Sequence, residues 1–265
     1  EVISTGGYMS LPLIFASKLL NLNLYLVEPN HVLGRSNRYF LNSCKKIFCY
    51  SSEIKNFPEK FKNKIKIIFP LVRKKIYNLQ SISQTKNKFT ILIVGGSQSA
   101  NIFNGHLKNV FVKLSKNFQI KIIHQTNENN IDNLKDFYMR NNLENEIFSF
   151  KDDFSEIIKQ VDLSITRAGA STLAELSLLY IPFIAVPLPS SKDNHQLENA
   201  KFYKNNNCCW VLEQKLFDEK IEKQLYEILD KKSDYLKKKE NLKKLNYQNT
   251  WNNVNEKILK AINEN

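Results

Sequence analysis

One stretch of the chain combines a glycine turn, hydroxyl side chains and an acid in an order that suits nucleotide binding. The apolar run 161–165 leads to Gly169, and residues 170–180 then carry apolar side chains at helical spacing. A helix that begins just after Gly169 presents unpaired N–H groups and the positive end of its dipole, which together favour a phosphate. Glu175, one turn further on, offers two carboxylate oxygens to ribose hydroxyls. An ordinary strand-to-helix connection, with Glu175 as a solvated first-turn acid, explains the same residues.

Two further polar loops follow predicted strands and could meet the first. The sequence GGSQ at 95–98 offers backbone N–H groups and the Ser97 hydroxyl to a phosphate, but it is neither G-x-G-x-x-G nor a P-loop. The loop 193–196 ends in Gln196, whose amide both donates and accepts hydrogen bonds, as sugar hydroxyls require. Because the carboxyl ends of parallel strands share one edge of a sheet, we expect the three loops to converge.

The sequence gives no sign of a metal site or a bound cofactor. The four histidines are not spaced as metal ligands, and no D-x-D motif is present to hold a metal-bound diphosphate. We therefore expect a positive helix end to stabilise a leaving diphosphate. The four cysteines form no C-x-x-C pair and are expected to be reduced thiols.

Composition predicts a globular protein that is attracted to anions. The chain has 265 residues, of which 42% are hydrophobic, and a net charge of +13. No stretch is long and apolar enough to span a membrane, so any membrane contact must be peripheral. We expect no nucleic-acid partner, because the basic residues are dispersed and no recognised nucleic-acid motif is present. The densest cluster, 231–244, is more typical of a solvated helical face.

The loops must be positioned by strands that alternate with helices, a pattern that predicts parallel α/β sheets. In the first part we predict helices over 11–20 and 38–43, and strands, the first of them buried, over 1–4, 22–27, 46–50 and 64–69. In the second part we predict a continuous helix over 102–114 and strands over 90–94, 119–125, 146–150, 161–165, 183–188 and 209–212. We therefore predict two units, 1–75 and 89–245, joined by a polar linker at 76–88. A final helix within 246–265 is expected to pack back toward the first unit.

Seven segments, in order along nearly the whole chain, form a combination that is far more specific than any of its parts. They are TGGYMS at 5–10, EPN at 28–30, VGGSQSANIFN at 94–104, HQT at 124–126, FKDDF at 150–154, RAGASTLAEL at 167–176 and PLPSSKDNHQLENA at 187–200. This combination resembles the MurG family of peptidoglycan N-acetylglucosaminyltransferases.

The resemblance implies a fold, a reaction and a set of binding residues. The fold is GT-B, in which two Rossmann-like doubly wound domains face each other and the C-terminal one holds UDP-GlcNAc. The reaction is an inverting transfer of GlcNAc to lipid I, giving lipid II, by a peripheral protein at the anionic cytoplasmic face of the bacterial inner membrane. The implied contacts are Ser97 and Ala170, Ser171 and Thr172 with the diphosphate, Glu175 with the ribose, the backbone at Lys151 with the uracil, Gln196 and Asn199 with the GlcNAc, Leu173 and Ala174 within the same donor-binding run, and Asn30 and Arg73 along the cleft.

The chain also departs from the family pattern. Its first residue lies after the position of the family's GGTGGH loop, whose histidine is a candidate general base, so no catalytic residue can be named. We therefore expect an incomplete N-terminal domain, weak binding of UDP-GlcNAc and no turnover by this segment alone. EPN stands where EQN is usual, and PLVR where NPVR is usual. A transferase with another lipid-linked acceptor, or a noncatalytic nucleotide-sugar-binding subunit that needs a partner chain, remains open.

Overall fold

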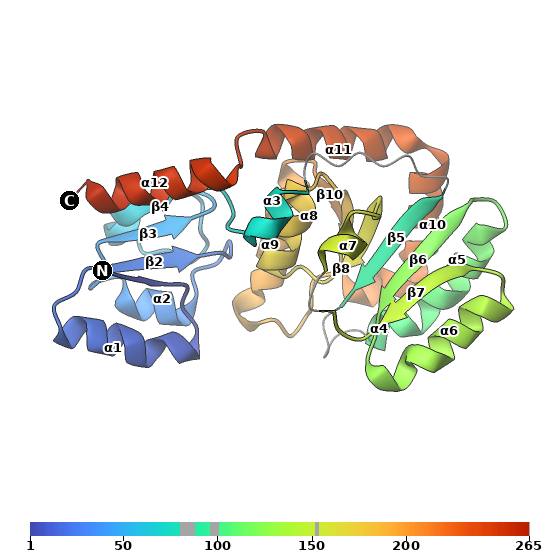
Figure 1. Cartoon of the computed structure of the whole chain (residues 1–265), viewed down its shortest axis with the longest axis horizontal. Helices are drawn as coiled ribbons and strands as arrows, with labels where there is room; N and C mark the ends of the chain where they lie inside the picture. Colours follow the sequence, from blue (N-terminus) through green and yellow to red (C-terminus); the bar gives the residue numbers. More distant parts are fainter. Residues whose placement is uncertain (80–87, 96–100, 152–153, 265) are drawn as a thin grey trace.

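The chain folds around two parallel β-sheets, each covered by helices (Figure 1). The structure is a computed structural model, and it describes residues 1–79, 88–95, 101–151 and 154–264. The N-terminal sheet has four strands and the C-terminal sheet has six. Within the described residues, no helix is long and apolar enough to cross a membrane.

The four-stranded sheet has the order β1-β2-β3-β4, and all its strand pairs are parallel. Its strands are β1 (Val2–Ser4), β2 (Leu24–Glu28), β3 (Lys46–Cys49) and β4 (Ile65–Ile67). Side chains alternate across β2, so Leu24 and Leu26 pack with α1 (Leu11–Leu19) and α2 (Arg35–Phe40). Tyr25 and Val27 point to the other face, where they pack against Ala261 and Ile262 of α12 (Trp251–Asn263). The C-terminal helix therefore completes the core around the first sheet.

Two expectations for this first part need correction. We predicted a buried strand over 1–4. Strand β1 instead lies at the edge of the sheet, and its Ile3 is 49% exposed. The helix predicted over 38–43 begins earlier, at Arg35, because Gly34 adopts an extended conformation and its carbonyl accepts the first intrahelical bond, from Arg38 N.

The six-stranded sheet has the order β10-β9-β8-β5-β6-β7, again with parallel pairs throughout. This is the doubly wound dinucleotide-binding order, in which successive strands are added first on one side of β5 and then, from β8 onward, on the other. Its strands are β5 (Phe89–Val94), β6 (Ile120–Gln125), β7 (Glu144–Phe148), β8 (Leu163–Thr166), β9 (Phe183–Ala185) and β10 (Cys209–Val211). Ligands of such sheets bind beyond the carboxyl ends of the strands at the reversal, here those of β5 and β8.

Helices cover both faces of the six-stranded sheet (Figure 1). Those on one face are α5 (His106–Ser115), α6 (Ile131–Arg140) and α10 (Phe217–Asp230); those on the other are α7 (Ser155–Ile158), α8 (Ala170–Leu178), α9 (His195–Asn205) and α11 (Lys232–Asn246). The helix predicted over 102–114 is interrupted: α4 (Asn101–Asn104) ends before Gly105, whose ψ of −86° is not helical. Gly105 therefore separates α4 from α5.

The chain passes between the two sheets at two places that contact each other. The first is α3 (Lys74–Tyr77) and the second is the turn between α11 and α12. The Tyr77 hydroxyl lies 3.3 Å from Asn249 Oδ1, and the Tyr77 ring packs edge-on against Trp251 with centroids 5.9 Å apart. Ile76 and Tyr77 are buried, so the start of the predicted linker 76–88 is packed; residues 80–87 lie outside the described residues.

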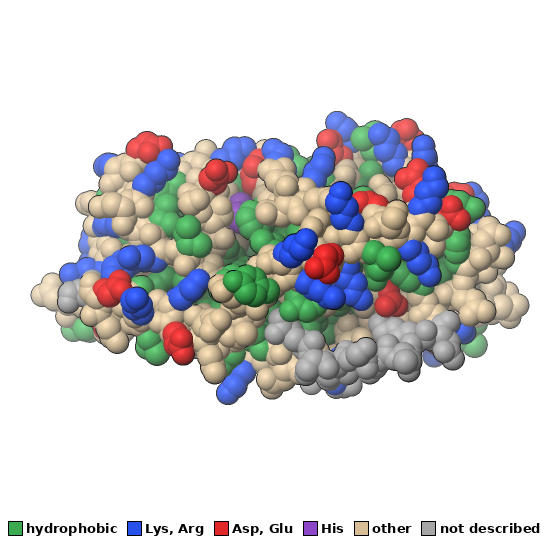
Figure 2. Space-filling view, turned by 90° about the horizontal axis from the view of Figure 1, so that it is seen from above, with side chains coloured by type: hydrophobic (Ala, Val, Ile, Leu, Met, Phe, Trp, Pro, Cys, Tyr) green, Lys and Arg blue, Asp and Glu red, His purple; other side chains and the backbone are tan. Residues whose placement is uncertain are grey.

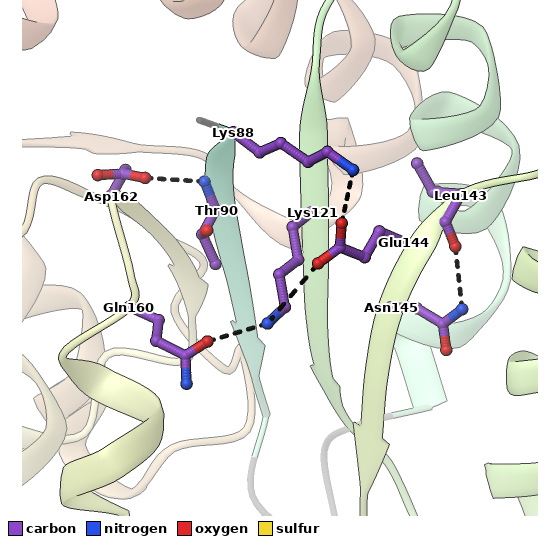
Figure 3. A network of polar contacts seen from close by, with 8 residues as sticks. All are labelled: Lys88, Thr90, Lys121, Leu143, Glu144, Asn145, Gln160 and Asp162. Carbon is purple, nitrogen blue, oxygen red and sulfur yellow. Dashed lines mark hydrogen bonds and ion pairs between the residues drawn. The ribbon is translucent and has the colours of Figure 1, made fainter. Parts of the chain in front are cut away.

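Polar contacts join the amino ends of β5, β6, β7 and β8 (Figure 3). The Lys88 ammonium lies 2.6 Å from Glu144 Oε2, which lowers the pKa of that carboxyl, and Asp162 Oδ2 accepts from Thr90 N at 2.8 Å. Lys121 donates to Gln160 Oε1 at 2.9 Å. These contacts lie at the edge opposite to the ligand-binding ends and serve to hold neighbouring strands in register.

Charge is spread over the face that carries α11 and α12. Figure 2 shows basic side chains there interspersed with acidic and neutral ones. Lys238 of α11 is buried and bonds Asn207 Oδ1 at 2.9 Å, so part of the lysine cluster 231–244 stabilises the fold.

Candidate functional site

The turn between β8 and α8 lies at the reversal point of the six-stranded sheet. Gly169 caps α8 in an extended conformation, and the first intrahelical bond runs from Leu173 N to Gly169 O at 3.0 Å. The backbone N–H groups of residues 170–172 come before Leu173 and have no acceptor within the helix. They are therefore the groups that the start of α8 offers to an anion. Leu173 and Ala174 have buried side chains and can face a ligand only through backbone atoms.

Gln196 joins this turn to the loop after β9. Its Oε1 accepts hydrogen bonds from Ala168 N at 3.2 Å and from Leu188 N at 3.0 Å. Because both partners are backbone donors, the amide oxygen must face them. Only the NH2 group of Gln196 is then left for a ligand. We had expected Gln196 both to donate hydrogen bonds to a sugar and to accept them, but in this arrangement it can only donate.

Arg73 and Glu175 form a bidentate ion pair at α8. Arg73 Nε donates to Glu175 Oε1 at 2.8 Å, and Nη2 donates to Oε2 at 3.1 Å. The Glu175 side chain is 13% exposed and that of Arg73 is 45% exposed. The predicted ribose acceptor is thus already fixed by a cation from the connection that follows the four-stranded sheet.

Asn199 on α9 binds the loop that follows β2. Its Oδ1 accepts from His31 N at 3.0 Å, and its Nδ2 donates to Asn30 Oδ1 at 3.1 Å and to Ala168 O at 3.2 Å. Asn199 is 1% exposed. Both of its N–H bonds serve the protein itself, so Asn199 holds the four-stranded sheet against the β8 turn.

Glu28 is a buried carboxylate that sequence reasoning did not single out. It ends β2, is 2% exposed and accepts hydrogen bonds from Gly34 N at 2.8 Å, Asn37 Nδ2 at 2.9 Å and Asn30 N at 3.1 Å. These bonds shape the loop that carries Asn30. An acid that ends an otherwise apolar strand, LYLVE, is the sequence signal that could have identified it.

A cavity of about 430 Å³ opens between the two sheets and reaches His195, the residue before Gln196. Residues from both sides line it, among them Gly6, Asn30 and Asn37 from the first part and Lys192, Asp193 and His195 from the second. Arg35 and Asp193 both line the cavity and are joined by two bonds of 3.1 Å, which hold the pKa of the Asp193 carboxyl below its usual range. Within the described residues, no group of three His, Cys, Asp or Glu side chains could hold a metal ion.

The sequence of the chain is similar to those of known glycosyltransferases. Residues 90–253 match the model of the glycosyltransferase family 28 C-terminal domain. The chain is 52% identical over 265 residues to the UDP-N-acetylglucosamine–N-acetylmuramyl-(pentapeptide) pyrophosphoryl-undecaprenol N-acetylglucosamine transferase of Pelagibacter ubique, and covers 74% of it. The chain belongs to the MurG family. A transferase of the same description from Rickettsia canadensis is 38% identical over 218 residues, and the chain spans 62% of its length.

Solved structures support the fold. The crystal structure of Acinetobacter baumannii MurG has a TM-score of 0.78 at 24% identity, with all of this chain and 74% of that chain covered. A UDP-GlcNAc 2-epimerase from Neisseria meningitidis has a TM-score of 0.68 at 10% identity, over all of this chain and 76% of that one. The predicted α/β fold, with parallel Rossmann-like sheets of GT-B type, is confirmed.

Five of the predicted site residues form two clusters. Gln196, Asn199 and Asn30 meet around Ala168, and Arg73 meets Glu175. Lys151 is exposed after β7, the edge strand, and lies outside both clusters. Ser97 lies outside the described residues. Their individual contacts with a donor stay predictions.

Proposed function

We propose that this chain carries the donor site of an inverting transfer of GlcNAc from UDP-GlcNAc to lipid I, the reaction for which its MurG relatives are named. The observation that carries the proposal is the convergence at Ala168. There the start of α8, which suits a diphosphate, lies beside the Gln196 amide, which suits a sugar. Glu175, five residues after Ala170 on α8, supplies oxygens for a ribose.

The cavity that reaches His195, the residue before Gln196, supports a second substrate on the other side of the transferred sugar. Gly6 and Asn37 line it from the first part, and Asp193 and His195 line it from the second, so an acceptor held there would lie next to a sugar held at Gln196. Bringing two reactants together in this way removes much of the entropic barrier to their reaction. We propose lipid I as that acceptor.

Peripheral contact with an anionic inner-membrane surface is part of the same proposal. The net charge of +13 supports it, because each basic residue near an anionic leaflet contributes attraction. We expect no nucleic-acid partner; salt-dependent retention on DNA at physiological ionic strength would contradict that expectation.

Titration of UDP and UDP-GlcNAc by calorimetry tests the donor site. We expect both to bind, and we expect Glu175→Ala to weaken UDP binding by about 1–3 kcal/mol, the range for a charge-assisted hydrogen bond. Glu198→Ala is the matched control, because Glu198 also pairs with a cation of the first part, Lys55 at 3.0 Å, but lies on α9. Absence of UDP binding, or equal UDP affinities of the wild type and Glu175→Ala, would contradict the assignment.

A further inference from the structure

The contact between Arg73 and Glu175 links the two sheets at the end of the site where a ribose would lie. Arg73 precedes α3, on the connection from the four-stranded sheet, whereas Glu175 belongs to α8 of the six-stranded sheet. Both carboxylate oxygens are held at once, at 2.8 Å and 3.1 Å. A bidentate guanidinium fixes the plane of a carboxylate as well as its position.

We propose that Arg73 is a positioning residue for ribose recognition, holding the Glu175 carboxylate ready to accept hydrogen bonds from the vicinal hydroxyls of a nucleoside diphosphate. The proposal rests on the proposed function, because it concerns the same donor site. A carboxylate has about four lone-pair directions, and the two bonds from Arg73 use two of them. Each oxygen therefore keeps one direction free, so ribose hydroxyls can bond the carboxylate without displacing Arg73.

Burial explains why Glu175 needs this cation. Its side chain is only 13% exposed, and a carboxylate so poorly hydrated is costly unless it is paired. Without Arg73, the carboxylate would rotate toward water and would have to be reordered when a ligand binds. The free energy required for that reordering would offset the free energy gained from the hydrogen bonds to the ribose.

Other contacts hold the two sheets together independently of Arg73. Asn199 bonds Asn30 at 3.1 Å, and Arg35 pairs with Asp193 through two bonds of 3.1 Å. Loss of the Arg73 guanidinium is therefore expected to leave the arrangement of the sheets in place. The effect should be confined to Glu175 and to any ligand group that it binds.

The experiment compares UDP with 2′-deoxy-UDP by calorimetry on the wild-type chain and on Arg73→Gln. We expect the wild type to bind UDP at least about tenfold more tightly than 2′-deoxy-UDP, as a hydrogen bond to a charged group implies. In Arg73→Gln we expect this preference to fall to about threefold or less. Arg35→Gln is the matched control, because it also removes an arginine of the first part that forms a bidentate pair, here with Asp193. This variant should keep the wild-type preference for UDP over 2′-deoxy-UDP.

Glu175→Gln, which replaces one oxygen by nitrogen, supplies a second and milder variant. It should lose the preference for UDP as Arg73→Gln does, and the double variant should lose no more than either single one, because both act on one hydrogen-bonding unit. If Arg73→Gln binds UDP with an unchanged or increased preference, this inference is wrong while the proposed function stands. If the wild type binds neither nucleotide, the proposed function fails and this inference fails with it.

Discussion

The imidazole of His31 lies flat against the ring of Phe202, with centroids 4.1 Å apart and planes 16° apart. His31 follows β2 and Phe202 belongs to α9, so the stack joins the two sheets at the same place as Asn199. His31 is 8% exposed. Burial lowers the pKa of its imidazole from 6.5 to about 4, against a smaller opposing effect of Glu198.

Acidification should weaken this contact. Because the pKa of His31 is lower in the folded state, the unfolded chain binds a proton between pH 6.5 and 4 that the folded chain does not. The stabilisation is therefore complete above pH 6.5 and declines as the pH falls toward 4. We expect this residue to lower the free energy of unfolding by about 2 kcal/mol between pH 7 and pH 5, measured by urea denaturation.

His31→Phe is the control for that measurement, since it keeps a stacking ring but cannot titrate. His124, whose pKa burial lowers to about 3, titrates in the same direction in both proteins and cancels in the comparison. The variant should lose less stability than the wild type on acidification. Parallel pH profiles of the two proteins would show that His31 does not contribute.

Asn199→Ala should destabilise the fold strongly. The change leaves His31 N and Ala168 O without their partner in a buried environment and removes a bond to Asn30. We expect a loss of about 3 kcal/mol in the free energy of unfolding, measured with urea. Asn206→Ala, at the exposed end of the same helix, removes only a bond to Phe202 O and should cost less than about 0.5 kcal/mol. Similar losses for both variants would disprove the bridging role of Asn199.

Gln196→Glu should reduce selectivity for the sugar part of the donor. The new side chain keeps an oxygen for Ala168 N and Leu188 N but loses the NH2 group. The added negative charge repels UDP, whose terminal phosphate carries an additional charge, at least as strongly as it repels UDP-GlcNAc. A fall in the ratio of the UDP-GlcNAc affinity to the UDP affinity therefore reports the lost sugar contact. We expect that ratio to fall by about tenfold, and calorimetric titration measures it. A constant ratio would mean that Gln196 does not touch the GlcNAc.

Gly6→Ala should be more harmful than Gly7→Ala. Both glycines have positive φ, 77° and 86°, so both variants suffer backbone strain of about 1 kcal/mol. A Cβ at Gly6 would lie 2.9 Å from Asn37 Oδ1, whereas one at Gly7 would meet nothing within 4 Å. Asn37 cannot yield easily, because it bonds Val27 O and Glu28. We expect about 1–2 kcal/mol of extra destabilisation for Gly6→Ala in thermal or urea unfolding, and equal effects would exclude the clash.

The sequence by itself determined the two parallel sheets and the placement of the polar loops at strand ends. The apolar run at 22–27 predicts a strand, and β2 forms there at Leu24–Glu28; of the helix predicted over 102–114, the part after Gly105 forms as the covering helix α5. Such patterns are local: they indicate whether a segment forms a helix or a strand and which of its side chains face a core. They failed where burial depends on neighbours, as at β1, which lies at a sheet edge and exposes Ile3.

Only the tertiary structure decided which polar atoms remain for a ligand. Arg73 meets Glu175 across 102 positions of the chain, and Asn199 meets Asn30 across 169. The amide oxygen of Gln196 is taken by two backbone N–H groups, and the Glu28 carboxylate is buried in a loop that it organises. No local periodicity encodes such pairings, because they arise when two separately patterned sheets pack and each buried polar group must find a partner.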